Sequence, residues 1–540
     1  MPQSQQTEDG RQASDQYLFP IHDEVLSFRR IFPRPAPRLN IANASDPGKQ
    51  KDRMLRQAGF IGILIALASL VSPRSSFADR PNVILCMADD LGWGDVGFNG
   101  NRIIQTPHLD RMASEALQLN RFYAAAPVCS PTRGSALTGR HPYRYGIFSA
   151  NRGHLPESER SLAELLSSVG YVAGHFGKWH LGTLTREGRD ANRGGNRNLG
   201  HFAPPWHHGF LTCFSTESKV PTWDPLLRPR GNSSRTWWNP ISKPSDAEAY
   251  GTAYWDERGQ SVTHGMRGDD SRLIMDHAIP FIQQAAKRGD PFLAVIWFHA
   301  PHLPVVAGPD YTKLYRDYPD YERHYYGCIT ALDEQIGRLR ATLRSSGVAD
   351  STIVWFCSDN GPEGQSGKAP GSAGPFRGRK RDLLEGGIRV PALVEWPGRI
   401  APGKSDFPAC TLDYVPTVLE LAGISLETPT RPQDGQSLVK LLRGEQIQRR
   451  PFGFQSADQL VWMDQQYKLI HRGRKPVRTG KAPLNQLNWQ LYDIVKDPAE
   501  ARDLSDRDPD RVLRMVRDLD RWRKSCLSSM EGKDYDGRAQ

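Results

Sequence analysis

The amino-acid sequence predicts an α/β protein in which helices cover both faces of a large mixed, mostly parallel sheet. Short continuous apolar runs recur at 81–88, 171–176, 292–299 and 352–357, and such runs are typical of strands buried on both faces of a parallel sheet. Segments with helical spacing separate these runs, which favours an α/β/α sandwich. Past residue 400 the elements become shorter. We therefore expect a main domain over 79–400 and a smaller C-terminal α+β subdomain with a short antiparallel sheet over 401–540.

The N-terminal part of the chain is expected to lie outside these domains. Residues 1–53 are polar and lack clear periodicity, so we interpret them as a non-native or disordered extension ahead of a natural start at Met54. Arginines precede an apolar run at 59–71, and Ser76-Phe77-Ala78 follows it. This pattern predicts a signal peptide over 54–78 and an exported protein, periplasmic or secreted. The run is too short to favour a stable membrane span.

Helices are expected between the apolar runs. Ser161 and Glu164 have the spacing of a capping box, which predicts a helix start at that point. A longer helix is predicted near 321–345, because apolar residues there recur on one helical face. Residues 182–265 are rich in Gly, Pro, Asn and Trp and are expected to form a long insertion of loops.

The C-terminal subdomain is expected to mix short helices and strands. A helix is predicted at 411–422, strand-like pieces at 467–471 and 489–492, and a charged helix near 509–524.

Composition narrows the range of functions. The net charge of +10 favours a polyanionic partner, but no zinc-finger or RNA-binding motif is present, so we expect no nucleic-acid partner. The seven cysteines are widely spaced and include no CxxC pair, which argues against a zinc site and a dense disulfide framework.

Polar side chains follow four of the predicted strands. Asp89 and Asp90 follow the first run, Asp359 and Asn360 follow the run at 352–357, and Lys178, His180 and His302 follow the other two. Active sites of open parallel sheets form beyond the carboxyl ends of the strands. Asp89-Asp90 alone could be a helix cap, and Asp359-Asn360-Gly361 alone could be a turn. Together, their oxygen donors predict a site for Ca²⁺ or Mg²⁺ rather than Zn²⁺.

One segment is more specific than the rest. Cys129-Ser-Pro-Thr-Arg133-Gly resembles Cys-x-Pro-x-Arg, the signature of type I, formylglycine-dependent sulfatases, an arylsulfatase-like family of the alkaline phosphatase superfamily. Further similar segments span roughly residues 80–505: Thr106–Asp110, Gly177–Gly182, Pro301–Pro304, Asp359–Gly361, Phe376–Lys380, Glu385–Pro391 and Leu491–Asp493.

The resemblance implies a mechanism and a set of roles. Cys129 would be oxidised to formylglycine by a separate formylglycine-generating enzyme, and the hydrated aldehyde would attack the sulfur of a sulfate ester. One Ca²⁺ per chain would be held by Asp89, Asp90, Asp359, Asn360 and the modified Cys129. The resemblance also assigns catalytic roles to five further side chains: Arg133, Lys178, His180, His302 and Lys380.

The expected substrate is a sulfated carbohydrate or a small aryl sulfate. Two alternatives stay open: a phosphonate monoester or phosphodiester hydrolase of the same superfamily, and a non-catalytic glycan-binding protein on the same fold. Arg379 and Arg381 flank Lys380, so this loop either favours a polyanion or is simply a solvated basic loop. Tryptophans of the 182–265 segment either stack on sugar rings or pack internally: Trp206, Trp223, Trp237, Trp238 and Trp255.

Overall fold

The computed structural model describes residues 80–190, 193–194, 199–425, 431–473, 484 and 487–535. All of these belong to one unit, Ser76–Gln540. The predictions for 1–53 and 54–78 lie outside the described residues. The division of the remaining chain at residue 400 stays a prediction.

Five parallel strands form the middle of a ten-stranded sheet. In spatial order they are β7 (Thr212–Thr216), β4 (Val172–Lys178), β12 (Phe292–Trp297), β1 (Asn82–Ala88) and β13 (Thr352–Ser358). Leu85 lies opposite Val295 on one neighbour and Trp355 on the other. Every residue of β1, β12 and β13 is buried, as continuous apolar runs predict for central parallel strands.

The edges of this sheet are mixed. Beyond β7 lie β10 (Tyr254–Trp255) and β11 (Ser261–Val262), both antiparallel to their neighbours. Beyond β13 lie β15 (Ala392–Glu395), β2 (Leu117–Leu119) and β16 (Gly403–Ser405). The predicted mixed, mostly parallel sheet is therefore confirmed.

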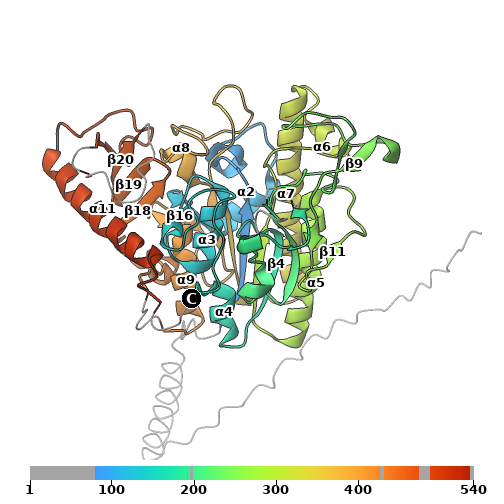
Figure 1. Cartoon of the computed structure of the whole chain (residues 1–540), viewed down its shortest axis with the longest axis horizontal. Helices are drawn as coiled ribbons and strands as arrows, with labels where there is room; N and C mark the ends of the chain where they lie inside the picture. Colours follow the sequence, from blue (N-terminus) through green and yellow to red (C-terminus); the bar gives the residue numbers. More distant parts are fainter. Residues whose placement is uncertain are drawn as a thin grey trace, which may run out of the picture. The chain divides into compact units, whose positions relative to one another are not determined.

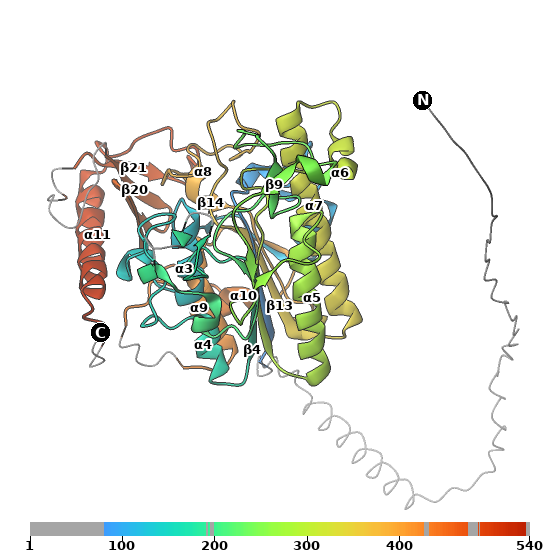
Figure 2. The same cartoon turned by 45° about the vertical axis from the view of Figure 1, so that its right-hand side comes forward.

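Helices cover both faces of the sheet (Figures 1 and 2). One face packs against α2 (Pro107–Glu115), α5 (Asp270–Arg288) and α7 (Asp320–Ser345). The other packs against α3 (Cys129–Thr138), α4 (Leu162–Ser167), α9 (Tyr414–Leu421) and α10 (Val439–Leu442). Alternate residues of β1 serve the two cores, Leu85 in one and Ile84 in the other. The α/β/α sandwich is thus confirmed.

Local sequence signals agree with the structure of two helices. Ser161 and Glu164 form the predicted capping box: each side chain accepts a hydrogen bond from the other residue's backbone N–H, at 3.1 and 2.8 Å. In α7 the predicted apolar stripe is buried, and it includes Ile329, Ile336 and Leu343.

The expectation that 182–265 forms only loops is wrong. The segment supplies β7 to the centre of the sheet and β10 and β11 to its edge. The sequence of β7, Thr-Cys-Phe-Ser-Thr, is short and half polar, so its strand character comes from pairing with β4 rather than from its own pattern. The segment also contains β5 (Arg189–Asp190), β6 (Arg193–Gly194), β8 (Leu227–Pro229) and β9 (Ala247–Ala249).

The C-terminal part contains the expected antiparallel sheet. Its strands are β18 (Phe452–Ser456), β19 (Gln459–Asp464), β20 (Tyr467–Arg472) and β21 (Gln490–Asp493). The closing helix α11 (Pro509–Met530) covers one face of this sheet and is longer than predicted. The other face packs around Tyr123 and Leu412 of the main body.

Shorter elements complete the described chain. The small strands are β3 (Phe122–Tyr123), β14 (Arg389–Val390) and β17 (Ala409–Cys410), and the short α-helices are α6 (Pro309–Leu314) and α8 (Glu385–Ile388). The 3₁₀ helices are Trp93–Asp95, Gly97–Asn99, Pro142–Arg144, Leu199–His201, Pro205–His208, Pro244–Asp246, Ala349–Ser351 and Thr411–Asp413.

Two further observations concern membrane-spanning helices and the cysteines. Among the described helices, none combines the length and the apolar character needed to cross a bilayer. All seven cysteines are free and buried.

Candidate active site and metal centre

Parallel pairing brings two predicted acidic segments together. Ala88 at the end of β1 lies opposite Ser358 at the end of β13, so the residues that follow them emerge side by side. The backbone N–H of Asp90 donates to Oδ1 of Asp359 at 3.1 Å, and Nδ2 of Asn360 donates to Oδ1 of Asp90 at 2.7 Å. Asp90 has a φ of 66°, a left-handed conformation that is uncommon for a non-glycine residue and is enriched at functional sites.

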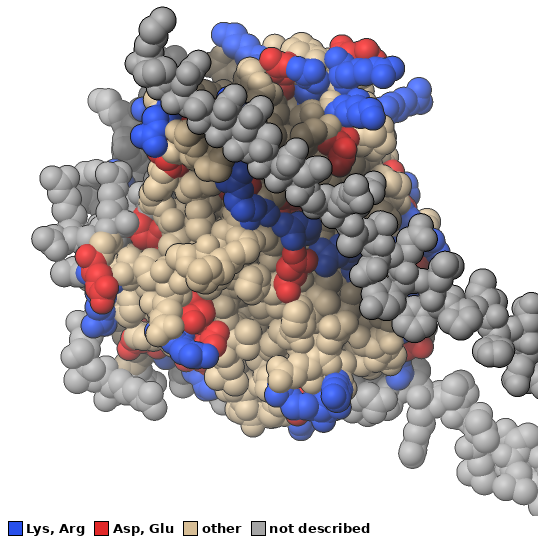
Figure 3. Space-filling view, turned by 90° about the vertical axis from the view of Figure 1, so that its right-hand side faces the viewer, with Lys and Arg blue, Asp and Glu red and all other residues tan. Residues whose placement is uncertain are grey.

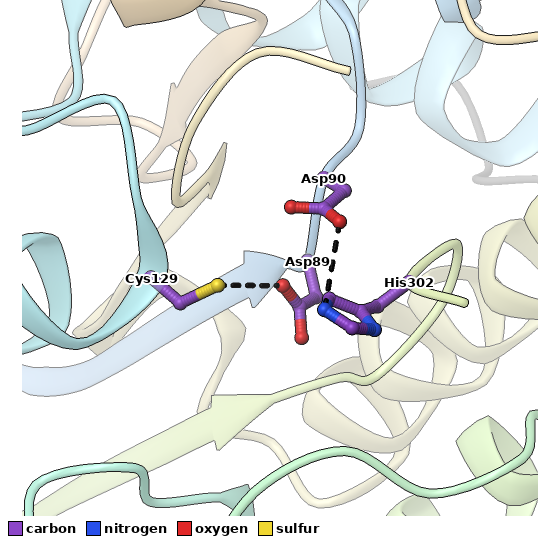
Figure 4. Close-up of side chains that lie close together, drawn as sticks. All are labelled: Asp89, Asp90, Cys129 and His302. Carbon is purple, nitrogen blue, oxygen red and sulfur yellow. Dashed lines mark hydrogen bonds and ion pairs between the residues drawn. The ribbon is translucent and has the colours of Figure 1, made fainter. Parts of the chain in front are cut away.

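Cys129 reaches the same place from the first turn of α3. Its Sγ lies 3.5 Å from Oδ1 of Asp89. His302, on the loop after β12, places Nε2 3.7 Å from Oδ2 of Asp90. Figure 4 shows Cys129 and His302 approaching the two aspartates from opposite sides. Each of these four residues offers one donor atom within 4.8 Å of the others.

Three buried cations surround the carboxylates. Nζ of Lys178 lies 2.5 Å from Oδ2 of Asp89, and Nζ of Lys380 lies 2.7 Å from Asp90. Arg133 donates from Nε and Nη2 to Oδ2 of Asp359, at 3.1 and 2.6 Å. Its Nη1 donates to the backbone oxygen of Lys178 at 3.1 Å. The site therefore holds three carboxylates and three fixed positive charges.

Burial raises the pKa values of the carboxyl groups in this site, and the neighbouring positive charges lower them. Burial alone would raise the pKa of Asp89, but Lys178, His302 and Arg133 hold it well below its usual value. Burial and the charge of Asp89 raise the pKa of Asp359 to about 7, against the opposing charge of Arg133. Burial raises the pKa of Asp90, which Lys380 opposes, and burial raises the pKa of the Cys129 thiol. Crowded buried carboxylates of this kind favour a cation.

The donor set fits a hard metal ion. Among the described residues, the buried Oδ1 of Asn360 has no hydrogen-bond partner, although a buried amide oxygen normally accepts one. It stands beside the carboxylates of Asp89, Asp90 and Asp359, and oxygen donors of this type suit Ca²⁺.

The predicted site residue His180 and the neighbouring His299 differ in surroundings. His180 has a φ of 58°, and its Nε2 lies 2.6 Å from Oδ1 of Asn151 and 3.4 Å from Oγ of Ser218. Buried His299, which the sequence analysis left out of the site, pairs with Asp270 at 2.8 Å and with Thr216 at 2.7 Å. These contacts agree with an internal structural role for His299.

Two charged residues near the site were missed. Lys219 follows β7, and burial together with the charges of Lys178 and Lys380 lowers its pKa. Glu363 lies 3.3 Å from Nζ of Lys380. Burial would raise the pKa of Glu363, but hydrogen bonds from Arg381 and the charge of Lys380 lower it to about 2. Lys219 could have been found only by recognising β7 as a strand.

The arginines flanking Lys380 have defined partners. Arg379 donates to the backbone oxygens of Gly371 and Glu363, both at 2.7 Å. Arg381 forms a two-point ion pair with Glu363, at 2.6 and 2.9 Å. These contacts hold the loop that carries Lys380.

The five tryptophans of the 182–265 segment have varied environments. Trp237 stacks on His324, and Nε1 of Trp255 donates to Asp190. Trp238 is buried, and Trp206 packs against the main core. Trp223 lines a surface cavity away from Cys129. Internal contacts therefore account for most of them.

An arrangement of this kind has a defined chemical use. Buried cations and a candidate metal site facing one nucleophile position are suited to binding and cleaving an ester that carries negative charge. The fold and the site together define a hydrolase of anionic esters at the carboxyl edge of a parallel sheet.

Comparisons with known proteins specify the class. The Sulfatase family model matches residues 81–424, and the model of the N-sulphoglucosamine sulphohydrolase C-terminal region matches 374–523. Steryl-sulfatase of Rattus norvegicus is 34% identical over 429 residues, covering 67% of this chain and 70% of that protein. Arylsulfatase G of Rattus norvegicus is 30% identical over 516 residues, covering 85% and 90%. N-acetylgalactosamine-6-sulfatase of Canis lupus familiaris is 33% identical over 419 residues, covering 74% and 73%.

Solved structures share the fold. Ps i-CgsB in complex with k-i-k-neocarrahexaose has a TM-score of 0.66 at 24% identity, covering 84% of this chain and 97% of that chain. The phosphonate monoester hydrolase of Agrobacterium radiobacter has a TM-score of 0.58 at 18% identity, covering 84% and 97%. The chain belongs to the sulfatase family and is a sulfuric ester hydrolase.

Proposed function

We propose that this enzyme hydrolyses sulfate monoesters of a sulfated carbohydrate, using a formylglycine made from Cys129 and one bound Ca²⁺. The observation that carries the proposal is the position of Cys129, which faces Asp89 inside a buried ring of Lys178, Lys380 and Arg133. Formylglycine supplies, as its hydrate, both the attacking hydroxyl and a second hydroxyl that allows sulfate to leave. A bound Ca²⁺ supplies charge neutralisation for the sulfate oxygens.

The positions of the side chains support the roles proposed for them. Asp89, Asp90, Asp359 and Asn360 hold the cation, with residue 129 beside them. Lys178 and Lys380 donate hydrogen bonds to sulfate oxygens as point charges. Arg133 fixes Asp359 and the end of β4.

The histidines move protons. His302 and Lys380 face the leaving-group oxygen from the Asp90 side and donate the proton that it needs. His180, oriented by Asn151 and Ser218, accepts the proton when sulfate is released.

A carbohydrate substrate is supported by two relatives. N-acetylgalactosamine-6-sulfatase and Ps i-CgsB with bound neocarrahexaose carry sugars in their names. Steryl-sulfatase makes a sterol sulfate the rival substrate. The apolar run at 59–71, followed by Ser76-Phe77-Ala78, supports export to the periplasm or medium, with Asp79 as the first residue of the exported protein.

The decisive test is sulfate release from a panel of sulfated sugars, an aryl sulfate and a sterol sulfate. The protein is co-produced with a formylglycine-generating enzyme and supplied with Ca²⁺, and the mass of the peptide containing residue 129 verifies the aldehyde. We expect sulfate release from sugars by the native chain and none by Cys129→Ala. Turnover of phosphonate or phosphate diesters in place of sulfates, with the aldehyde present, would contradict the proposal. Binding without any turnover would favour a glycan-binding protein.

A further inference from the structure

A cavity of about 650 Å³ is lined in part by residues adjacent in sequence to the proposed active site. Three of its lining residues are neighbours in sequence of site residues. Val128 precedes Cys129, Arg381 follows Lys380, and Arg152 follows Asn151, the partner of His180. The backbone N–H of Arg381 donates to the oxygen of Pro127 at 2.8 Å, which joins two of these walls.

The C-terminal part of the chain forms the remaining wall. Residues 455–457, at the end of β18 and the start of the turn after it, line the cavity, and so do Arg523, Leu527 and Met530 of α11. Phe148, whose side chain is partly exposed, lines it from the main body. The cavity therefore lies where the C-terminal sheet and helix meet the loops of the active site, and it has room for one or two sugar rings.

The charged residues that line the cavity are all positive. Three arginines line the cavity, Arg152, Arg381 and Arg523, and no Asp or Glu is present among its described lining residues. Arg381 is already neutralised by its two-point ion pair with Glu363. Arg152 and Arg523 are the guanidinium groups left to receive a ligand.

Arg523 is the more informative of the two. It is only 5% exposed, and among the described residues its buried Nε has no hydrogen-bond partner. Burial lowers the pKa of Arg523, although the charge of Asp520 opposes this, and no ion pair joins the two side chains in the described part of the chain. A buried guanidinium without a counter-ion is costly, and such groups are normally paired.

We infer that this cavity binds the leaving-group side of the substrate and that Arg523, assisted by Arg152, recognises a second anionic group on it. This inference rests on the proposed function and specifies the substrate class: a sulfated sugar linked to a unit that carries another sulfate or a carboxylate. Apolar surfaces of Val128, Phe148 and Leu527 contact the faces of the sugar rings. A guanidinium binds either oxyanion through two parallel hydrogen bonds.

The test compares matched ligands on a protein that cannot turn them over. Calorimetry measures binding to Cys129→Ala of three disaccharides that share one sulfated sugar, whose second unit is neutral, sulfated or a uronate. We expect the two charged disaccharides to bind about 10- to 100-fold more tightly than the neutral one, the range expected for charge-assisted hydrogen bonds. The charged disaccharide that binds more tightly identifies the second anionic group as a sulfate or a carboxylate.

Substitutions locate the effect. Arg523→Met in the Cys129→Ala background is expected to abolish the preference for the charged disaccharides, and Arg152→Met, a change at an exposed residue, to reduce it. Arg517→Met, on the exposed side of α11 and outside the cavity, serves as the matched control and keeps the full preference. The melting temperature of the ligand-free protein should not fall in Arg523→Met, because the substitution removes an unpaired buried charge.

The outcomes separate this inference from the proposed function. Equal binding of all three disaccharides, tighter binding of a sterol sulfate, or an unchanged preference in Arg523→Met would overturn the inference while leaving sulfate release intact. A preference that depends on Arg523 supports it. That result would stand even if the mature enzyme failed to release sulfate, which would overturn the proposed function alone.

Discussion

Arg133 shows how one residue organises this site. Its side chain is fully buried, it holds Asp359 by two hydrogen bonds, and it lies over the ring of Trp297. It also fixes the backbone oxygen of Lys178, so one planar group sets the relative positions of β13 and the end of β4. Lysine offers one point charge and cannot reproduce this planar set of donors.

We therefore expect Arg133→Lys to lower kcat/KM for sulfate ester hydrolysis by about 100-fold or more, the scale of losing one preorganised charged donor. Steady-state kinetics on the aldehyde-containing protein measures this effect. Arg111→Lys, at an exposed residue of α2, is the control and should leave kcat/KM unchanged. A loss of less than threefold in Arg133→Lys would show that positive charge alone is sufficient at this position.

Asn360 tests the metal site. Because its buried Oδ1 lacks a protein partner, we expect Asn360→Leu to weaken Ca²⁺ binding by about tenfold or more. Calorimetric titration of the chelator-treated protein with Ca²⁺ gives the affinity directly. The rise in melting temperature on adding Ca²⁺ to the native chain should shrink in the variant. Unchanged affinity would remove Asn360 from the proposed ligand set.

Most candidate site residues could be selected from the sequence because they follow buried strands. Asp89, Asp90 and Asp359 could be grouped from strand ends alone, since parallel neighbours share one edge. Cys129 could not be placed this way, because it begins a helix, and only its resemblance to a known signature drew attention to it. Arg523 carried no sequence signal, because its burial without a counter-ion depends on how α11 packs.

At the scale of elements, the central strands were predictable and the edges were not. β1, β12 and β13 are buried on both faces, so hydrophobicity alone marks them. β7 is polar at three of its five positions, without alternation, and exists as a strand because β4 pairs with it from Gly174 to Lys178. Tertiary pairing therefore overrode the local pattern, as is common for strands.

A buried ion-pair cluster joins the C-terminal sheet to the main body. Lys468 of β20 lies 3.0 Å from Glu385 and 2.9 Å from Glu500, and all three are fully buried. Tyr123 of β3 donates to Glu385 at 3.0 Å. The cluster therefore links β20, α8 and β3.

We expect Lys468→Met to lower the free energy of unfolding by about 3–5 kcal/mol, because two buried carboxylates lose their cation. Urea denaturation followed by circular dichroism measures this change. Lys496→Met, at an exposed lysine after β21, should alter the free energy by less than about 0.5 kcal/mol. Equal effects in the two variants would show that the cluster does not stabilise the junction.

At the scale of the whole described unit, a second buried ion pair, together with a hydrogen bond from Trp522, ties α11 to the rest of the molecule. Arg144 pairs with Asp434 at 2.7 Å, and Nε1 of Trp522 in α11 also donates to Asp434. Burial would raise the pKa of Asp434, but the charge and hydrogen bonds of Arg144 hold it below its usual value. The ionised form is therefore favoured by folding.

The lowered pKa of Asp434 gives a prediction for the stability of the protein in acid. Asp434 stabilises the fold above its unfolded pKa of about 3.9, and that contribution is lost as pH falls through this value toward the lower folded pKa. We expect Asp434→Asn to be less stable than the native chain at pH 7 and to lose less stability between pH 5 and pH 3. Urea denaturation across that range checks both statements. Parallel pH curves for the two proteins would contradict the assignment.

The net charge of the chain is +10, but the balance of positive and negative side chains differs between the surface and the cavity. On the face shown in Figure 3, Lys and Arg lie among Asp and Glu and large uncharged areas. Elsewhere, ion pairs such as Arg272–Asp276 and Arg338–Asp276 give arginines a carboxylate partner. In the cavity beside Cys129, by contrast, two arginines remain for a ligand, so local pairing decides the chemistry more than the total charge does.

Under the proposed function, the burial of Cys129 fixes the order of two events in the life of the chain. The residue is 1% exposed, and all ten residues of α3 are buried. An enzyme that oxidised Cys129 would need access to a side chain that the folded protein does not present. The proposed oxidation would therefore come first and folding second. Chains that folded before oxidation would stay inactive, so the fraction of active enzyme would depend on how fast this segment is modified.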